Sequence, residues 1–155
     1  MKTLILYASK YGAAREIAER IAKKIDNAVV CDLKQDTPPL SQFDCVICGS
    51  SLYAGSIRKE ARAFLADNAD ELSKKKLGLF LSGFAPDSAD NDFAKNFPAK
   101  VIQAARAKAH LGGIFDPKKA GAPERFIIKI VMKQTGYIDS INDEKIAGFV
   151  ADLNR

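Results

Sequence analysis

Apolar residues occur in five short, continuous runs along the chain, each bounded by turn-forming or charged residues. Runs of this length are typical of strands that are buried on both faces, as in a parallel sheet covered by helices. The clearest cores are Leu4-Ile5-Leu6, Val46-Ile47 and Leu79-Phe80-Leu81. We expect strands over residues 2–8, 28–33, 43–49, 76–83 and 109–115.

Between these runs the apolar positions recur with helical spacing. Ile17, Ile21 and Ile25 form one stripe of an amphipathic helix. Near the carboxyl end, Ser140 stands three residues before Asp143 and resembles a capping box at the start of the last helix. Helices are expected over residues 14–25, 57–72, 93–108, 123–134 and 142–154.

The alternation of strands and helices favours an α/β fold with a five-stranded, doubly wound parallel sheet. Right-handed crossovers leave few other arrangements, and they place helices on both faces of the sheet. In such folds ligands bind beyond the carboxyl ends of the strands, where the strand order reverses. The segments after the first, third and fourth strands are therefore the candidate binding segments.

Length and composition limit the class of protein. The 155 residues, of which 47% are hydrophobic, fit a single domain over residues 1–155 with a substantial core. The first apolar run is too short for a signal peptide, and no run approaches the roughly 18 apolar residues of a membrane span. We therefore expect a soluble, cytoplasmic protein.

The cysteines and the single histidine predict no chemistry of their own. Three cysteines do not resemble a secreted disulfide framework. Cys45 and Cys48 spell a CxxC motif, but side chains three apart on a strand face opposite sides. We interpret them as buried free thiols and His110 as a structural residue. No metal site and no catalytic acid, base or nucleophile is assigned.

The segment after the first strand has the form of a phosphate-binding turn. A tight polar turn here leads into a helix, whose first N–H groups lack partners and lie at its positive end. No GxxxxGK[ST] or GxGxxG motif is present, which argues against ATP or a dinucleotide and favours a mononucleotide such as FMN. The candidate phosphate-binding residues are Ser9, Lys10, Tyr11, Gly12, Ala13 and Ala14.

The segments after the third and fourth strands combine small residues with one aromatic ring each. Small residues let the backbone approach a ligand, and Tyr53 or Phe84 can stack on a flat heterocycle. Tyr53 is the first choice for stacking on an isoalloxazine ring. The candidate ring-binding residues are Ser50, Ser51, Leu52, Tyr53, Ala54, Gly55, Ser82, Gly83 and Phe84.

With these motifs the whole chain resembles the flavodoxin-like family. The phosphate turn of that family is matched at Ser9, Gly12 and the Ile17-Ala18 pair, whereas Ala14 stands where the family usually has Thr. The resemblance implies a three-layer sandwich with parallel strands in the order 2-1-3-4-5. It also implies FMN as cofactor and electron transfer as function, with Lys10 or Tyr11 compensating for the hydroxyl that Ala14 lacks.

A closer resemblance is to the flavodoxin-domain branch that includes menaquinone-dependent protoporphyrinogen oxidase. It lies in the segment of residues 49–55, Gly-Ser-Ser-Leu-Tyr-Ala-Gly, and in the basic, apolar segment of residues 125–133. Residues 116–123 lack the Arg-, Tyr- and Trp-rich character expected of that enzyme. A redox carrier or small flavin oxidoreductase, a protoporphyrinogen oxidase-like enzyme passing electrons to a quinone, and a flavin-free interaction module remain as alternatives.

Charge is concentrated in the last third of the chain. Residues 100–133 hold eight basic and two acidic residues, a net +6, against +5 for the whole chain. On a helical wheel Arg125, Lys129 and Lys133 form one stripe beside apolar residues. The partner is therefore expected to be an acidic redox protein or a quinone-linked substrate. The basic stripe is interpreted either as the solvent-exposed edge of a docked helix or as a surface that contacts the inner membrane face transiently.

Other uses of this architecture lack their residues. A phosphoacceptor domain needs acidic residues where Ser9 and Ser50 stand, and a cysteine phosphatase needs an Arg six positions after its Cys, where this chain has Ser51 or Ala54. A nucleic-acid-binding surface is not expected either, because the basic segment carries no aromatic interleaving or recognisable motif.

Overall fold

The computed structural model describes residues 1–119, 121, 125, 129 and 136–155. Its centre is a parallel sheet in the order β2-β1-β3-β5-β6. These five strands correspond to the expected order 2-1-3-4-5, which is thereby confirmed. A short strand, β4, pairs antiparallel with the end of β3 and was not expected. The strands are β1 (Thr3–Ala8), β2 (Ala28–Asp32), β3 (Cys45–Tyr53), β4 (Ser56–Ile57), β5 (Lys76–Ser82) and β6 (Ala107–His110).

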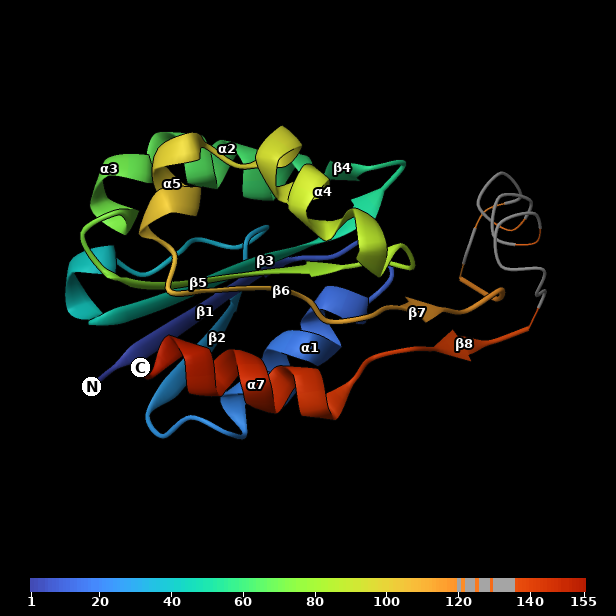
Figure 1. Ribbon diagram of the computed structural model, residues 1–155, viewed down its shortest axis with the longest axis horizontal. Helices are drawn as coiled ribbons and strands as arrows, with labels where there is room; N and C mark the ends of the chain where they lie inside the picture. The colour runs from blue at the N-terminus through green and yellow to red at the C-terminus, as the bar shows by residue number, and fades with distance from the viewer. Residues whose placement is uncertain (120, 122–124, 126–128, 130–135) are drawn as a thin grey trace.

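Helices cover both faces of the sheet (Figure 1). α1 and α7 lie on one face, and α2, α3, α4 and α5 lie on the other. Alternate strand residues supply the two cores, so that Leu4 and Leu6 face one layer and Ile5 faces the other. The helices are α1 (Ala13–Ala22), α2 (Lys59–Asp67), α3 (Ala69–Leu72), α4 (Ala89–Asn96), α5 (Ala99–Ala104) and α7 (Asp143–Leu153), with 3-10 turns at η1 (Leu40–Gln42) and η2 (Pro86–Ser88).

The CxxC motif is divided between these two cores. Cys45 packs with the α1 and α7 layer, whereas Cys48 packs with the opposite layer. Both thiols are free and fully buried. Burial raises the pKa of the Cys48 thiol to about 12, because the thiolate would be desolvated. Both cysteines therefore act as small apolar residues, as the sequence predicted.

The prediction of one continuous helix over residues 93–108 is wrong. Pro98 forces the preceding residue out of the helical region, and Phe97 is extended, with φ −111° and ψ 145°. α4 therefore ends at Asn96, and Pro98 caps the short helix α5. Beyond it the backbone joins the sheet, where the Arg106 N–H donates to the Leu77 carbonyl at 2.8 Å.

Other boundaries also differ from the prediction. The expected helix over residues 57–72 begins only at Lys59 and is broken at Asn68. The fifth strand ends at His110, because Gly112 turns the chain at φ +91°. Asn142, rather than Ser140, caps α7 by accepting the Lys145 N–H at 3.1 Å.

A two-stranded ribbon projects from the sandwich on the side of the strand carboxyl ends. It consists of β7 (Ile114–Phe115) and β8 (Ile138–Asp139), which pair antiparallel (Figure 1). The basic segment lies between these strands, and its described residues Arg125 and Lys129 are exposed. Lys133 and most of the helix expected over residues 123–134 lie outside the described residues. Within the described part of the chain, no helix is both long and apolar enough to cross a membrane.

Candidate cofactor site

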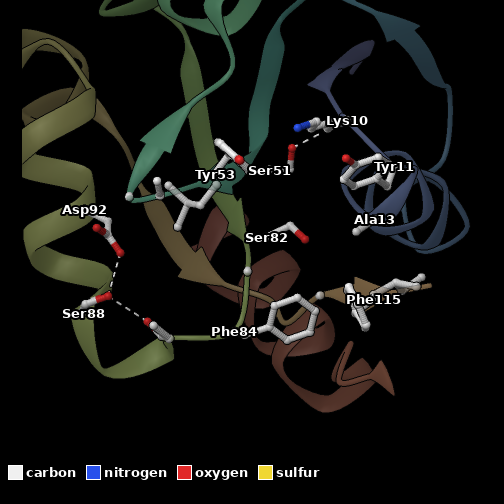
Figure 2. Close-up of a pocket in the computed structure, with 17 residues that line it drawn as sticks. Lys10, Tyr11, Ala13, Ser51, Tyr53, Ser82, Phe84, Ser88, Asp92 and Phe115 are labelled. Carbon is white, nitrogen blue, oxygen red and sulfur yellow. Dashed lines mark hydrogen bonds between the residues drawn. The ribbon is translucent and has the colours of Figure 1, made fainter. Parts of the chain in front are cut away.

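A cavity of about 320 Å³ lies beyond the carboxyl ends of β1, β3 and β5. It brings together the three segments that the sequence singled out, as Figure 2 shows. Its volume falls within the range of about 300–1,000 Å³ typical of ligand pockets. Of the predicted site residues, its walls include Lys10, Tyr11, Ala13, Ser51, Leu52, Tyr53, Ala54, Gly55, Ser82, Gly83 and Phe84.

Four predicted residues lie just behind these walls. Ser9 and Gly12 shape the turn after β1, where the Ser9 hydroxyl accepts the Gly12 N–H at 2.8 Å. Ala14 is fully buried in the core beneath α1, so its side chain does not line the cavity. Ser50 is also buried, and its hydroxyl accepts the Arg58 N–H at 2.9 Å. These residues support the walls from behind.

The turn after β1 presents backbone N–H groups at the start of α1. Gly12 has φ +102°, a conformation that L side chains rarely adopt, and it precedes the first helical residue. Among the described residues, no acceptor bonds the N–H of Tyr11, Ala13 or Ala14. Such N–H groups, at the positive end of a helix dipole, suit an anion.

Lys10 places a cation at the same end of the cavity. Its ammonium lies 4.0 Å from the centre of the Tyr53 ring and 5.1 Å from that of Tyr11. The Lys10 backbone N–H lies 3.3 Å from the Ser51 hydroxyl, which links the turn to β3 (Figure 2). Positive charge and donor groups therefore meet at this end.

The segment that the sequence placed in a loop after the third strand is a hairpin. β3 continues to Tyr53 instead of ending at Gly49, because β4 folds back and pairs Tyr53 with Ser56. Ala54 and Gly55 connect the strands with φ +50° and +78°, the signs that a two-residue type I′ turn requires. Tyr53 is 38% exposed and borders the cavity.

The opposite wall is apolar. Phe84 packs against Phe115 of β7 and Ile138 of β8. The Gly83 N–H donates to the Gly112 carbonyl at 3.1 Å, and thereby holds the segment after β5 beside the start of the ribbon. Figure 2 shows Tyr53 and Phe84 on opposite sides of the cavity. A flat ring fits between two such aromatic walls.

Ser88 and Asp92, neither of which was predicted from the sequence, close the end of the cavity that lies away from Tyr11 (Figure 2). The Asp92 side chain comes from α4, is 7% exposed and accepts the Ser88 hydroxyl at 2.7 Å. Within the described residues, no cation lies within 4 Å of this carboxylate. In the sequence Asp92 resembles the exposed Asp87 and Asp90, so only the three-dimensional arrangement distinguishes it.

His110 lies behind Gly83, which lines the cavity. It is 6% exposed, and its Nε2 would lie 3.3 Å from a Cβ added at Gly83. Burial, with a smaller contribution from the Lys145 charge, lowers the pKa of His110. Within the described residues, no cluster of three or more His, Cys, Asp or Glu side chains could hold a metal ion.

Comparisons with known proteins agree with this architecture. Protoporphyrinogen IX dehydrogenase [quinone] of Escherichia coli strain K12 is 25% identical over 147 residues, which cover 88% of this chain and 81% of the relative. The fold is similar to that of a flavodoxin from Streptococcus pneumonia TIGR4, with TM-score 0.58, 17% identity, and coverage of 99% of this chain and 98% of that one.

A second solved structure is a flavoprotein in complex with FMN from Lactobacillus acidophilus NCFM. It has TM-score 0.52 and 16% identity, with 72% of this chain and 91% of that chain covered. The sequence model of the family described as "Flavodoxin domain" matches residues 4–142. The chain therefore belongs to the flavodoxin domain family.

Proposed function

We propose that this protein binds FMN in the cavity between β1, β3 and β5 and acts in electron transfer. The observation that carries this proposal is that the segments after three strands converge on one cavity, whose two ends differ in chemistry. Donor groups lie at one end, with Lys10 beside them over the Tyr53 ring, and Tyr53 and Phe84 lie on opposite sides of the cavity. A phosphate and a flat ring joined by a ribityl chain match that arrangement.

In this proposal the phosphate lies on the turn of residues 9–14. The N–H groups of Tyr11, Ala13 and Ala14 supply hydrogen bonds without any side-chain hydroxyl at position 14. Because the Ala14 side chain points into the core, this position offers its backbone to the phosphate. Lys10 supplies the compensating charge.

The isoalloxazine ring lies between Tyr53 and Phe84. Bound FMN supplies reversible one- and two-electron transfer. The chain holds the phosphate, orients the ring and excludes water from it through the apolar wall of Phe84 and Phe115. The Asp92 carboxylate adds a buried negative charge beside the ring, which opposes the gain of electrons.

Reconstitution tests the proposal directly. The purified protein is incubated with FMN, passed over gel filtration, and examined by visible absorption during anaerobic reduction and reoxidation. We expect flavin bands that co-elute with the protein and bleach reversibly. Loss of all flavin on the column would contradict the proposal and favour the flavin-free interaction module.

A second candidate is the oxidation of a porphyrinogen with transfer of electrons to a quinone. The similarity to the Escherichia coli dehydrogenase over 88% of this chain favours it. The test is an anaerobic assay of the FMN-loaded protein with protoporphyrinogen and a menaquinone analogue, with assays that lack the quinone or the flavin as controls. Formation of fluorescent porphyrin that requires both quinone and flavin would support this activity, and its absence would leave the carrier role.

We further propose that the protein is cytoplasmic and that its basic segment contacts an acidic partner or the inner membrane face. Arg125 and Lys129 are exposed, as such a contact requires. Co-sedimentation with anionic and with neutral lipid vesicles distinguishes contact with the membrane from contact with an acidic partner protein. Binding that needs anionic lipid and weakens when Arg125, Lys129 and Lys133 are replaced by Gln would support membrane contact, and equal binding to neutral vesicles would contradict it.

A further inference from the structure

Asn96, the last residue of α4, forms hydrogen bonds with three different parts of the structure. Its side chain is buried, at 5% exposure. The amide Nδ2 donates to the Gly55 carbonyl at 2.9 Å and to the Asp92 carbonyl at 2.8 Å. The Oδ1 atom accepts the Ile57 N–H at 3.2 Å and the Arg62 guanidinium at 2.9 Å. All four hydrogen-bonding positions of this amide are therefore used.

Two of these bonds lie on either side of Ser56, the first residue of β4. Gly55 precedes β4 and Ile57 ends it, so Asn96 holds β4 at both ends. β4 has two residues and, among the residues that the structure describes, it pairs only with β3. A hairpin this short has little stability of its own. Its position therefore depends on a residue 41 positions away in the chain.

The same hairpin carries the Tyr53 wall of the cavity. Tyr53 pairs with Ser56, the residue between the two that Asn96 holds. One turn earlier on α4, Asp92 lines the cavity, and its carbonyl accepts one Asn96 amide hydrogen. A single side chain thus fixes the distance between the hairpin and the helix that flank the ring-binding part of the cavity.

We propose that Asn96 is a positioning residue that sets the affinity of the site for the flavin ring by holding the Tyr53 hairpin against α4. This inference rests on the proposed binding of FMN. Truncation of Asn96 leaves the half-buried Gly55 carbonyl and the buried Ile57 N–H without their partner, and the hairpin must shift to reach water. None of the hydrogen bonds of Asn96 described above reaches the phosphate turn, so the contribution of that turn to binding should stay unchanged.

The test compares Asn96→Ala with Asn68→Ala. Asn68 also donates its side-chain amide to a backbone carbonyl, that of Phe64, in the same helical layer. It lies between α2 and α3, at the opposite end of that layer from β4 (Figure 1). Affinities for FMN and for riboflavin are measured by flavin fluorescence, together with the thermal midpoint of each variant.

Asn96→Ala should weaken binding of both FMN and riboflavin by about tenfold, so that the ratio of their affinities stays at the wild-type value. It should also reduce the quenching of flavin fluorescence by Tyr53. Asn68→Ala should lower the thermal midpoint but leave both affinities unchanged. A merely structural role for Asn96 would make the two variants behave alike, which would overturn the inference.

Asn96→Asp gives a second test if the alanine variant does not fold. It keeps the side-chain volume and the acceptor for Ile57 and Arg62 but replaces the donor that faces the Gly55 carbonyl. We expect the same loss of affinity for both ligands, and wild-type affinity would overturn the inference. If the wild-type protein itself binds no flavin, the proposed function fails. If the wild-type protein binds flavin and the Asn96 variants bind it with the same affinity, this inference alone fails.

Discussion

The two ends of the cavity are held in place in different ways. The phosphate turn is stabilised mainly by neighbours in the sequence, because Ser9 bonds Gly12 and α1 follows at once, with one bond from Lys10 to Ser51 of β3. The Tyr53 hairpin depends on α4, through Asn96. A change at the turn should therefore act locally on phosphate binding, whereas ring binding is open to changes in α4 and the ribbon. FMN and riboflavin, which differ only by the phosphate, separate the two effects.

The largest effect is expected at Gly12. Its φ of +102° strains any L side chain, although no atom lies within 4 Å of an added Cβ. Gly12→Ala should cost about 2 kcal/mol in the turn and weaken FMN binding about 30-fold without changing riboflavin binding. Titration of both ligands measures this. Gly148→Ala, in an open position of α7, is the matched control and should leave both affinities unchanged; equal losses for both ligands in Gly12→Ala would contradict the local role of the turn.

Removal of the Tyr53 ring should have the next largest effect. Tyr53→Ala removes one aromatic wall, which contributes about 1 kcal/mol to stacking, so we expect both FMN and riboflavin to bind about fivefold to tenfold more weakly. Tyr137→Ala is the control, because that side chain is 61% exposed and does not line the cavity. Selective loss of FMN binding in Tyr53→Ala would place Tyr53 at the phosphate instead.

Asp92 should alter the reduction potential more than the affinity. Asp92→Asn keeps the volume and the bond to Ser88 but removes a buried negative charge beside the ring. The midpoint potential should rise by about 20 mV for the two-electron couple, which is about a fivefold change in the equilibrium. Anaerobic spectroelectrochemistry measures the shift. Asp90→Asn, at an exposed position of the same helix, should not change the potential; a fall in the potential of Asp92→Asn would exclude this electrostatic role.

The smallest effect concerns pH. Burial lowers the pKa of His110 in the folded protein, so below the ordinary value of about 6.5 the unfolded chain binds a proton that the folded chain resists. The free energy of unfolding should therefore fall as the pH decreases through 6.5, by a fraction of the single-proton limit of about 1.4 kcal/mol per pH unit. Urea titrations from pH 7.5 to 5.5 should show a flatter dependence for His110→Gln, and an unchanged slope would mean that another group is responsible.

The sequence predicted what local pattern encodes. The apolar runs and the polar turn at Ser9 were predicted because period, length and turn chemistry act within a few residues, whereas the strand order came from the resemblance to the flavodoxin-like family. The prediction of one helix over residues 93–108 is wrong because Pro98 forces Phe97 out of the helical region, a signal that the sequence itself carries. Asp92 and Asn96 were not recognised because their roles come from residues far away in the chain, and nothing in an acidic, polar helix marks which positions face inward.

The comparison of FMN with riboflavin in the wild-type protein tests the central claim most directly. If the turn after β1 holds the phosphate through its N–H groups and Lys10, FMN should bind about 100-fold more tightly than riboflavin, which corresponds to about 3 kcal/mol from charge-assisted hydrogen bonds. Equal affinity for the two ligands, or binding of neither, would contradict the assignment of this cavity as an FMN site.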